Sequence, residues 1–198
     1  MAADAAREAP LVAVLAAGSA TRFGGGKLDA ECAGKRVGAW AISAVARAGL
    51  EAGVIVVPPD PPAFATEAGG WKVIINPDAA EGLGTSVALA ARRALAEGAD
   101  LLILLADMPL IEPAHLRDLL SGGAAAATAH GLRAGVPAFV PRALLGPLTE
   151  LAGEGGAGPV LARLDDLRLV TASQGTLLDV DRPQDLQIAA KVLARREA

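Results

Sequence analysis

LVAVLAAGSATRFGGGK, residues 11–27, begins with five apolar residues and runs directly into a segment that contains four glycines. A continuous apolar run of this length is typical of a strand buried on both faces of a mainly parallel sheet. Similar short runs follow along the chain at 54–57, 73–75 and 101–105. Two less regular segments, at 124–128 and 136–140, are candidates for further strands.

Helical patterns separate these apolar runs. Apolar residues between 37 and 48 recur every three or four positions, and Gly49 follows them as a stop signal. A second helix is expected at 85–97, and a third near Glu112, with Pro113 in its first turn. Strands and helices in alternation predict an α/β fold with three layers, α/β/α, around a mainly parallel central sheet.

The composition favours one globular domain over residues 1–198, with residues 1–9 as a flexible N-terminal tail. Eighteen basic residues against 22 acidic ones give a net charge of -4, which argues against broad capture of nucleic acid or of an acidic membrane. No secretory signal is apparent, and no apolar stretch approaches the roughly 20 residues of a membrane helix. Together with the single cysteine, Cys32, these features predict a cytoplasmic protein.

The glycine-rich segment after the first apolar run has the properties of a phosphate-binding loop. Glycines allow close backbone approach and leave successive N–H groups open to an anion. Arg22 and Lys27 add the positive charge that a triphosphate needs. Ligands of such sheets bind beyond the carboxyl ends of the strands, which is where this segment begins.

Two better-known phosphate loops do not match this segment. A Walker A loop requires glycine six positions before the lysine, where Thr21 stands, and Ser or Thr after it, where Leu28 stands. The dinucleotide fingerprint requires a second glycine two positions after the first, but Ala20 follows Gly18 at that spacing. The loop therefore belongs to another class of nucleotide site.

Two carboxylates are candidates for binding a metal ion beside the phosphates. Asp107 emerges from the apolar run at 101–105, and Pro109 fixes the following turn. Asp181 belongs to an Asp-x-Asp segment that precedes the last helix. Hard oxygen ligands beside a polyphosphate commonly hold Mg²⁺. For Asp181 an equally good reading is that it caps the helix that Pro183 begins.

Taken in order, four motifs resemble those of the molybdenum cofactor nucleotidyltransferases (MobA/MocA-like NTP transferases), and most of all the cytidylyltransferase branch. The motifs are LAAGSATRFGGGK, NPDAAEGLGTSV, ADMP and DVDRPQDL. The resemblance covers nearly the whole chain and implies a Rossmann-like nucleotidyltransferase fold. The chain departs from the common family patterns at Ala106, Glu154, Arg182 and Gln184.

The resemblance also implies roles for individual residues. Arg22, Lys27 and Asp107 would be catalytic, with the two cations on the triphosphate, and Asp107 with Asp181 would hold Mg²⁺. The residues implied for nucleotide binding, besides Lys27, are Leu15, Ala16, Ala17, Gly18, Ser19, Asn76, Gly82, Gly84 and Ser86. Those implied for the acceptor side are Gly135, Pro137 and Gly155.

The implied reaction is in-line attack by an acceptor phosphate on the α-phosphorus of an NTP, with pyrophosphate leaving. A phosphate nucleophile needs no strong base, so we expect no catalytic role for His115 or His130. The implied substrates are CTP, which Ala16 and Ala17 favour by resemblance, and the terminal phosphate of molybdopterin. Hand-over of the product to a molybdoenzyme or its chaperone would follow.

Three alternatives remain open from the sequence. The enzyme could use GTP with molybdopterin, or act on a sugar phosphate or phospholactate. From a different class, the chain could be a nucleotide-binding regulator without catalysis. No nucleic-acid or membrane partner is expected.

Overall fold

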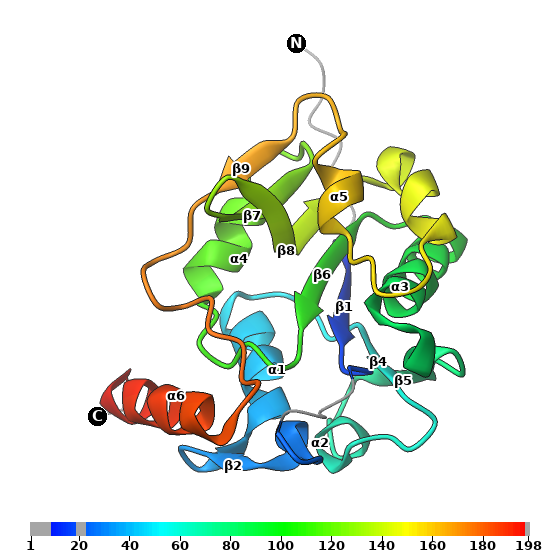
Figure 1. Cartoon of the computed structure of the whole chain (residues 1–198). Helices are drawn as coiled ribbons and strands as arrows, with labels where there is room; N and C mark the ends of the chain where they lie inside the picture. Colours follow the sequence, from blue (N-terminus) through cyan, green and yellow to red (C-terminus); the bar gives the residue numbers. More distant parts are fainter. Residues whose placement is uncertain (1–8, 19–22, 197–198) are drawn as a thin grey trace.

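The computed structural model describes residues 9–18 and 23–196, and these form a central sheet of seven strands with helices on both faces (Figure 1). The strands of this sheet are β1 (Leu11–Leu15), β4 (Val54–Val57), β5 (Lys72–Ile75), β6 (Leu101–Leu105), β7 (Ala126–His130), β8 (Arg133–Val140) and β9 (Arg168–Val170). The helices are α1 (Val37–Arg47), α2 (Ala63–Thr66), α3 (Leu83–Glu97), α4 (Pro113–Leu120), α5 (Gly158–Leu161) and α6 (Pro183–Arg196).

Short elements complete the described chain. The 3₁₀ turns are η1 (Lys27–Asp29), η2 (Ala79–Glu81), η3 (Arg142–Leu144) and η4 (Gly146–Glu150). A separate two-stranded ribbon pairs β2 (Glu31–Cys32) with β3 (Lys35–Arg36) in antiparallel fashion. No helix among the residues described is both long and apolar enough to cross a membrane.

The strand order in the sheet is β5-β4-β1-β6-β8-β7-β9. The pairs β4 with β5, β1 with β4 and β1 with β6 are parallel, so the carboxyl ends of these four strands lie at one edge of the sheet. Strand β8 runs antiparallel to both β6 and β7, and β9 is parallel to β7. This mainly parallel sheet confirms the predicted fold class.

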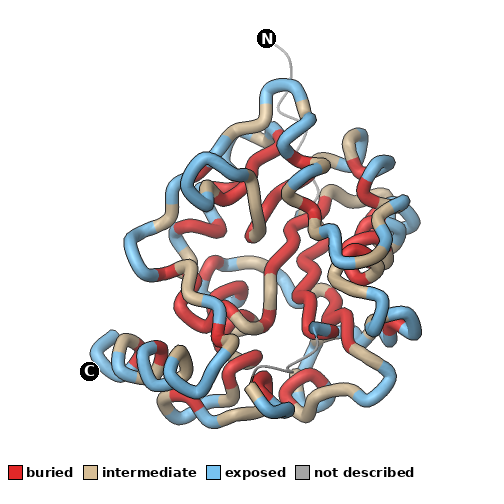
Figure 2. The backbone as a smooth tube through the Cα atoms, in the orientation of Figure 1, coloured by how far each residue is buried: buried red, intermediate tan, exposed pale blue. Residues whose placement is uncertain are grey.

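Alternate side chains of the buried strands pack into two separate apolar cores, one on each face of the sheet. In β1, Val12 and Val14 face the core beneath α1, α4 and α6, whereas Leu11, Ala13 and Leu15 face the core beneath α3 and α5. This alternation is the direct result of strand geometry, in which successive side chains point to opposite faces. Figure 2 shows the buried backbone concentrated in these central strands. The two cores make three layers, as predicted.

The predicted strand limits agree with β1, β4 and β6, and the edge strand needs a correction. The run at 73–75 was expected to be buried on both faces, but Val73 is 39% exposed and Ile75 is 55% exposed. The reason is that β5 pairs on one side only and has no strand beyond it. Strand β8 begins three residues earlier than its apolar run because its polar start pairs with β7, which the apolar pattern cannot reveal. The predicted tail covers residues of which only Ala9 is described.

Gly53 tests the contact between β1 and the start of β4. A Cβ atom at this position would lie 2.1 Å from the carbonyl oxygen of Val12, so the backbone itself would have to move. We expect Gly53→Ala to lower the free energy of unfolding by about 2 kcal/mol, measured by urea denaturation. In Gly69→Ala the added methyl group meets no atom within 4 Å, so this control should remain within about 0.5 kcal/mol of wild type. Equal stability of the two variants would contradict the contact.

Candidate nucleotide and metal site

The candidate site lies at the carboxyl ends of β1 and β6, where both strands continue into loops. Hydrogen bonds extend the sheet past the strand ends: Ala16 N–H donates to the carbonyl of Val56 (2.8 Å), and Ala106 N–H donates to that of Leu15 (2.9 Å). The backbone is therefore fixed up to the residue before Asp107. This is the edge at which ligands of parallel sheets bind.

Three of the predicted residues meet at this edge. The ammonium nitrogen of Lys27 lies 2.7 Å from Asp107 Oδ2 and 3.0 Å from Asp181 Oδ1, across sequence separations of 80 and 154 residues. Lys27 is only 6% exposed, although it is a lysine in a loop region. The predicted convergence of the cationic glycine loop with an acidic strand end is therefore present.

Asp181 is placed by two sets of backbone contacts. The N–H of Val180 donates to the carbonyl of Asp107 (2.9 Å), which ties the segment before α6 to the turn after β6. The carboxylate of Asp185 accepts from the N–H groups of Asp181 (3.1 Å) and Arg182 (2.8 Å). Asp185 thus reaches back from the first turn of α6 to the residues before it, while the carboxylate of Asp181 accepts a hydrogen bond from Lys27.

The sequence analysis missed Asp185, although a signal was present. An acidic residue in the first turn, shortly after Pro183, is the usual position for a side chain that reaches back to the residues before the helix. The motif DVDRPQDL therefore combines a residue that faces the site with a residue that holds the segment in place.

The site is strongly charged and partly desolvated. Burial alone would lower the pKa of Lys27, but the negative charge of Asp107 and the hydrogen bonds to Asp107 and Asp181 raise it above its ordinary value. Although much of Asp179 is exposed, its carboxyl group is desolvated enough, and near enough to the charges of Asp107 and Asp181, to raise its pKa to about 6. Among the described residues, carboxylates therefore gather around the ammonium group of Lys27.

The carboxylates fit a divalent metal ion. Asp107 Oδ1 is buried and has no hydrogen-bond partner among the described residues, so one lone-pair-bearing oxygen is left for a further ligand. Asp107 and Asp181 offer the hard oxygens that Mg²⁺ and Mn²⁺ prefer. Within residues 9–18 and 23–196 no group of three or more His, Cys, Asp or Glu side chains forms a complete metal site. The remaining ligands would then be water and substrate phosphates, as is usual for Mg²⁺.

A cavity of about 390 Å³ opens beside these carboxylates. Its size lies within the range of small-molecule sites, about 300 to 1,000 Å³. The predicted residues that line it are Leu15, Ala17, Gly18, Lys27, Gly82, Asp107 and Asp181. Glu154 also lines it, although the sequence analysis noted this residue only as a departure from the family pattern.

Gly82 and Gly84 bring the loop that carries Glu154 against α3. A Cβ atom on Gly82, whose φ is 124°, would lie 2.5 Å from the backbone of Gly153, and one on Gly84 would lie 2.8 Å from the carbonyl oxygen of Gly155. The N–H of Gly84 donates to the carbonyl of Gly153 (2.9 Å). These glycines therefore permit a direct backbone contact that no larger residue would allow, and Gly155 takes part in it.

A second cavity of about 310 Å³ adjoins the first, since Gly18 and Lys27 line both. Ala16 lies on its wall, together with Gly25 and Gly26. The proline-rich loop at 58–62 forms another part of its wall. Only the fold shows that this loop, which follows β4, stands beside the glycine loop.

Other predicted residues lie away from the cavity walls. Asn76 and Ser86 are buried, and the amide of Asn76 donates to the Ser86 hydroxyl (2.9 Å), which holds the turn before α3. Gly135 and Pro137 lie within β8 and line neither cavity. The predictions for Ser19 and Arg22 fall outside the described residues.

The two histidines are accounted for by structural contacts. His115 is buried and its Nε2 lies 2.8 Å from the Thr128 hydroxyl, and burial lowers the pKa of His115. His130 Nε2 lies 2.9 Å from the carbonyl oxygen of Val136. Neither lines the cavity that contains the carboxylates.

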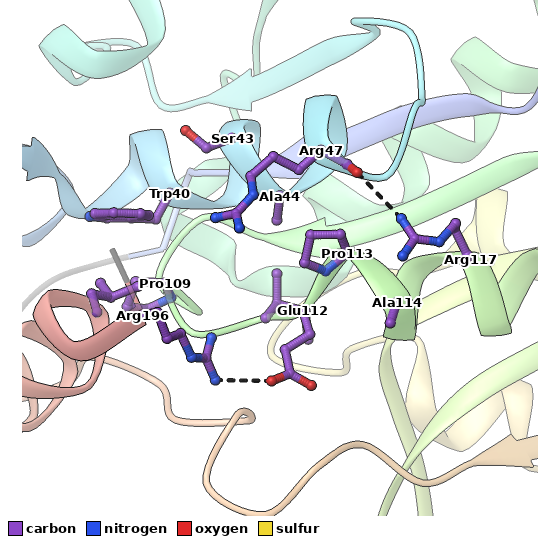
Figure 3. Close-up of a pocket in the computed structure, with 12 residues that line it drawn as sticks. Trp40, Ser43, Ala44, Arg47, Pro109, Glu112, Pro113, Ala114, Arg117 and Arg196 are labelled. Atoms are coloured by element: carbon purple, nitrogen blue, oxygen red, sulfur yellow. Dashed lines mark hydrogen bonds and ion pairs between the residues drawn. The ribbon is translucent and has the colours of Figure 1, made fainter. Parts of the chain in front are cut away.

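A larger cavity, of about 610 Å³, lies between α1, α4 and α6 (Figure 3). Arg47, Arg117 and Arg196 stand around it, and Arg196 pairs with Glu112 at 3.1 Å. None of the predicted site residues lines this cavity. The predicted cation and the two predicted carboxylates instead line the cavity of about 390 Å³, which is therefore the candidate nucleotide site.

Comparison with known proteins identifies a family and a shared fold. The model of the MobA-like NTP transferase domain matches residues 12–167. No curated protein sequence matches the chain significantly. Among solved structures, a nucleotidyl transferase from Methanothermobacter (Mth528) is 22% identical with a TM-score of 0.79, and the match covers 96% of this chain and 99% of that one.

Two further solved structures have the same fold. Rv0371c from Mycobacterium tuberculosis, in a complex with manganese, is 19% identical with a TM-score of 0.71, covering 92% of this chain and 98% of that one. Molybdopterin-guanine dinucleotide biosynthesis protein A from Archaeoglobus fulgidus is 18% identical with a TM-score of 0.69, covering 93% and 98%. At these identities the likeness establishes the shared fold.

Asp185 provides a test of how the site is held. We expect Asp185→Ala to lower the free energy of unfolding by about 1 kcal/mol in urea, because two backbone N–H groups lose their acceptor. Gln184→Ala, which changes the neighbouring exposed residue, should leave stability within about 0.5 kcal/mol of wild type. If Asp185→Ala and Gln184→Ala have the same free energy of unfolding, Asp185 does not hold the segment that carries Asp181.

Proposed function

Because the chain belongs to the MobA-like NTP transferase family, we propose that this nucleotidyltransferase moves a nucleoside monophosphate from CTP to the terminal phosphate of molybdopterin. Pyrophosphate is the second product. The observation that carries the proposal is the meeting of Lys27, Asp107 and Asp181 beside a cavity of about 390 Å³. A cation and two hard carboxylates in one partly buried site are what a metal-bound triphosphate requires.

The protein would act mainly by positioning and by neutralising charge. An oxygen of the acceptor phosphate forms a bond to the α-phosphorus. The bond from that phosphorus to the oxygen that bridges the α- and β-phosphates breaks, and this oxygen leaves with the pyrophosphate. The backbone around Gly18, which lines both cavities, would contact the phosphates. Lys27 would bind the triphosphate and neutralise charge that builds up on the leaving pyrophosphate. We also assign Arg22 to the triphosphate, from its place in the glycine loop.

Asp107 and Asp181 would hold the metal ion, which we propose to be Mg²⁺. When bound, the ion neutralises phosphate charge and polarises the phosphoryl group. No general base is needed, since an acceptor phosphate is already ionised at neutral pH.

The choice of substrates rests on sequence motifs. The four family motifs favour molybdopterin as acceptor, and Ala16 with Ala17 favours CTP over GTP. The nucleoside would lie near Ala16, Ala17 and the Gly82 turn, with Ser19, Asn76, Gly84 and Ser86 supporting that side of the site. The acceptor would enter past Gly155 and the strand that carries Gly135 and Pro137. We further propose a cytoplasmic location, with hand-over of the product to a molybdoenzyme or its chaperone.

Pyrophosphate release is the direct test of the proposal. The purified protein is assayed with each of the four NTPs and Mg²⁺, with and without molybdenum-loaded molybdopterin. We expect release with CTP that depends on molybdopterin. Release with GTP would identify the guanylyl branch, whereas release only with a sugar phosphate or phospholactate would replace the acceptor. Binding of NTP without release from any mixture would favour a regulator and would contradict catalysis.

Asp107→Asn tests the metal ligand. We expect pyrophosphate release to fall by at least about a hundredfold, because a neutral amide is a poor ligand for the ion. Stability should fall by only about 1 kcal/mol, since the asparagine oxygen still accepts a hydrogen bond from Lys27. The matched control is Asp165→Asn, at an exposed position outside the cavities described above, and it should keep wild-type turnover. Turnover near wild type in Asp107→Asn would remove this residue from the metal site.

A further inference from the structure

The ammonium group of Lys27 occupies one oxygen of each carboxylate. It lies 2.7 Å from Asp107 Oδ2 and 3.0 Å from Asp181 Oδ1, so it bridges the two carboxylates. A magnesium ion binds carboxylate oxygens at about 2.0 to 2.1 Å and would bring two positive charges close to the ammonium group. The lysine in this position therefore competes with a metal ion shared by the two carboxylates.

The backbone of Lys27 is fixed, whereas its side chain has an alternative direction. Lys27 begins η1, directly after Gly26, whose φ is 62°. The turn is anchored by Asp29, whose carboxylate accepts from the N–H groups of Ala63 and Phe64, each at 2.8 Å. Lys27 lines both the carboxylate cavity and the adjoining one, so rotation of its four-carbon stem can redirect the ammonium group.

The contacts are not those of an ion pair built only for stability. Asp107 uses one oxygen for Lys27, while its other oxygen is buried and has no partner among the described residues. Leaving a buried carboxylate oxygen without a partner costs free energy, which a purely structural bridge would avoid. The arrangement instead leaves an oxygen ready for a ligand that arrives later.

We propose that Lys27 is a countercharge that lowers the affinity of the metal site until nucleotide arrives, an inference that rests on the proposed function. Without nucleotide, the ammonium group offsets negative charge on Asp107 and Asp181 and competes with the metal ion. The phosphates of a nucleotide give the ammonium group a partner other than these carboxylates, and its departure removes its contacts with Asp107 Oδ2 and Asp181 Oδ1. Metal binding and nucleotide binding are then coupled through one side chain, so that each ligand raises the affinity for the other.

The test measures Mn²⁺ binding to the nucleotide-free protein by the loss of the free-ion electron paramagnetic resonance signal. We expect Lys27→Met, which keeps the length of the side chain and removes its charge, to bind Mn²⁺ about tenfold more tightly than wild type. Lys27→Arg keeps a cation and should stay within about twofold of wild type. Lys72→Met makes the same charge change at an exposed residue at the start of β5, away from the carboxyl ends of the strands. This variant should bind Mn²⁺ with wild-type affinity.

A crystal structure of the wild-type protein grown with MnCl₂ gives a second readout that does not depend on the folding of a variant. We expect Mn²⁺ on Asp107 and Asp181, with the Lys27 nitrogen moved beyond about 4 Å from both carboxylates. Equal Mn²⁺ affinity of wild type and a folded Lys27→Met would overturn the proposal. So would a bound ion with both lysine contacts intact. Neither readout involves turnover, so failure here is distinct from failure to release pyrophosphate.

Discussion

One buried ammonium group joins three separate parts of this chain. Lys27 comes from the turn after the glycine loop, Asp107 from the turn after β6, and Asp181 from the segment before α6. Lys27 is buried, and an unpaired charge there would be costly, so the lysine requires a negative charge beside it. The rest of the site depends on this contact because it fixes where the loops from the strand ends come together.

The sheet makes this contact feasible. Parallel pairing of β4, β1 and β6 places the carboxyl ends of these strands at one edge. The pairing continues beyond β6, because the N–H of Ala106 donates to the carbonyl of Leu15. The bond from Val180 to Asp107 then adds the C-terminal segment to that edge. A nucleotidyltransferase that works by positioning needs such rigid support, since small displacements of charged groups weaken their effect on the transition state.

The two adjoining cavities are lined by different chemical groups. The carboxylates and Glu154 line one cavity, the proline-rich loop at 58–62 lines the other, and Gly18 and Lys27 belong to both. A triphosphate that passes along the glycine loop would therefore lie next to Lys27, a side chain that also contacts the carboxylates. This geometry is the basis of our proposal that Lys27 competes with the metal ion before nucleotide binds and contacts phosphate afterwards.

The fold class, the limits of β1, β4 and β6, and the choice of Lys27, Asp107 and Asp181 as candidate site residues could all be predicted from the sequence. This was possible because a buried strand needs a short apolar run, and because a phosphate loop needs glycine and cations directly after such a strand. The ADMP and DVDRPQDL motifs likewise marked Asp107 and Asp181, although the second motif left open whether Asp181 was a ligand or a cap.

The tertiary structure decided what depends on contacts between distant residues. Only the fold shows that Asp185 holds the start of α6, that Asp181 contacts Lys27, that β5 is an exposed edge, and that the loop at 58–62 lines a cavity. Asn76 and Ser86, predicted to bind the nucleotide, are buried and hydrogen-bonded to each other in the fold, and they hold the turn before α3. The physical reason is that local patterns report the backbone that a segment prefers, whereas the partner of a buried charge is set by how separate segments pack.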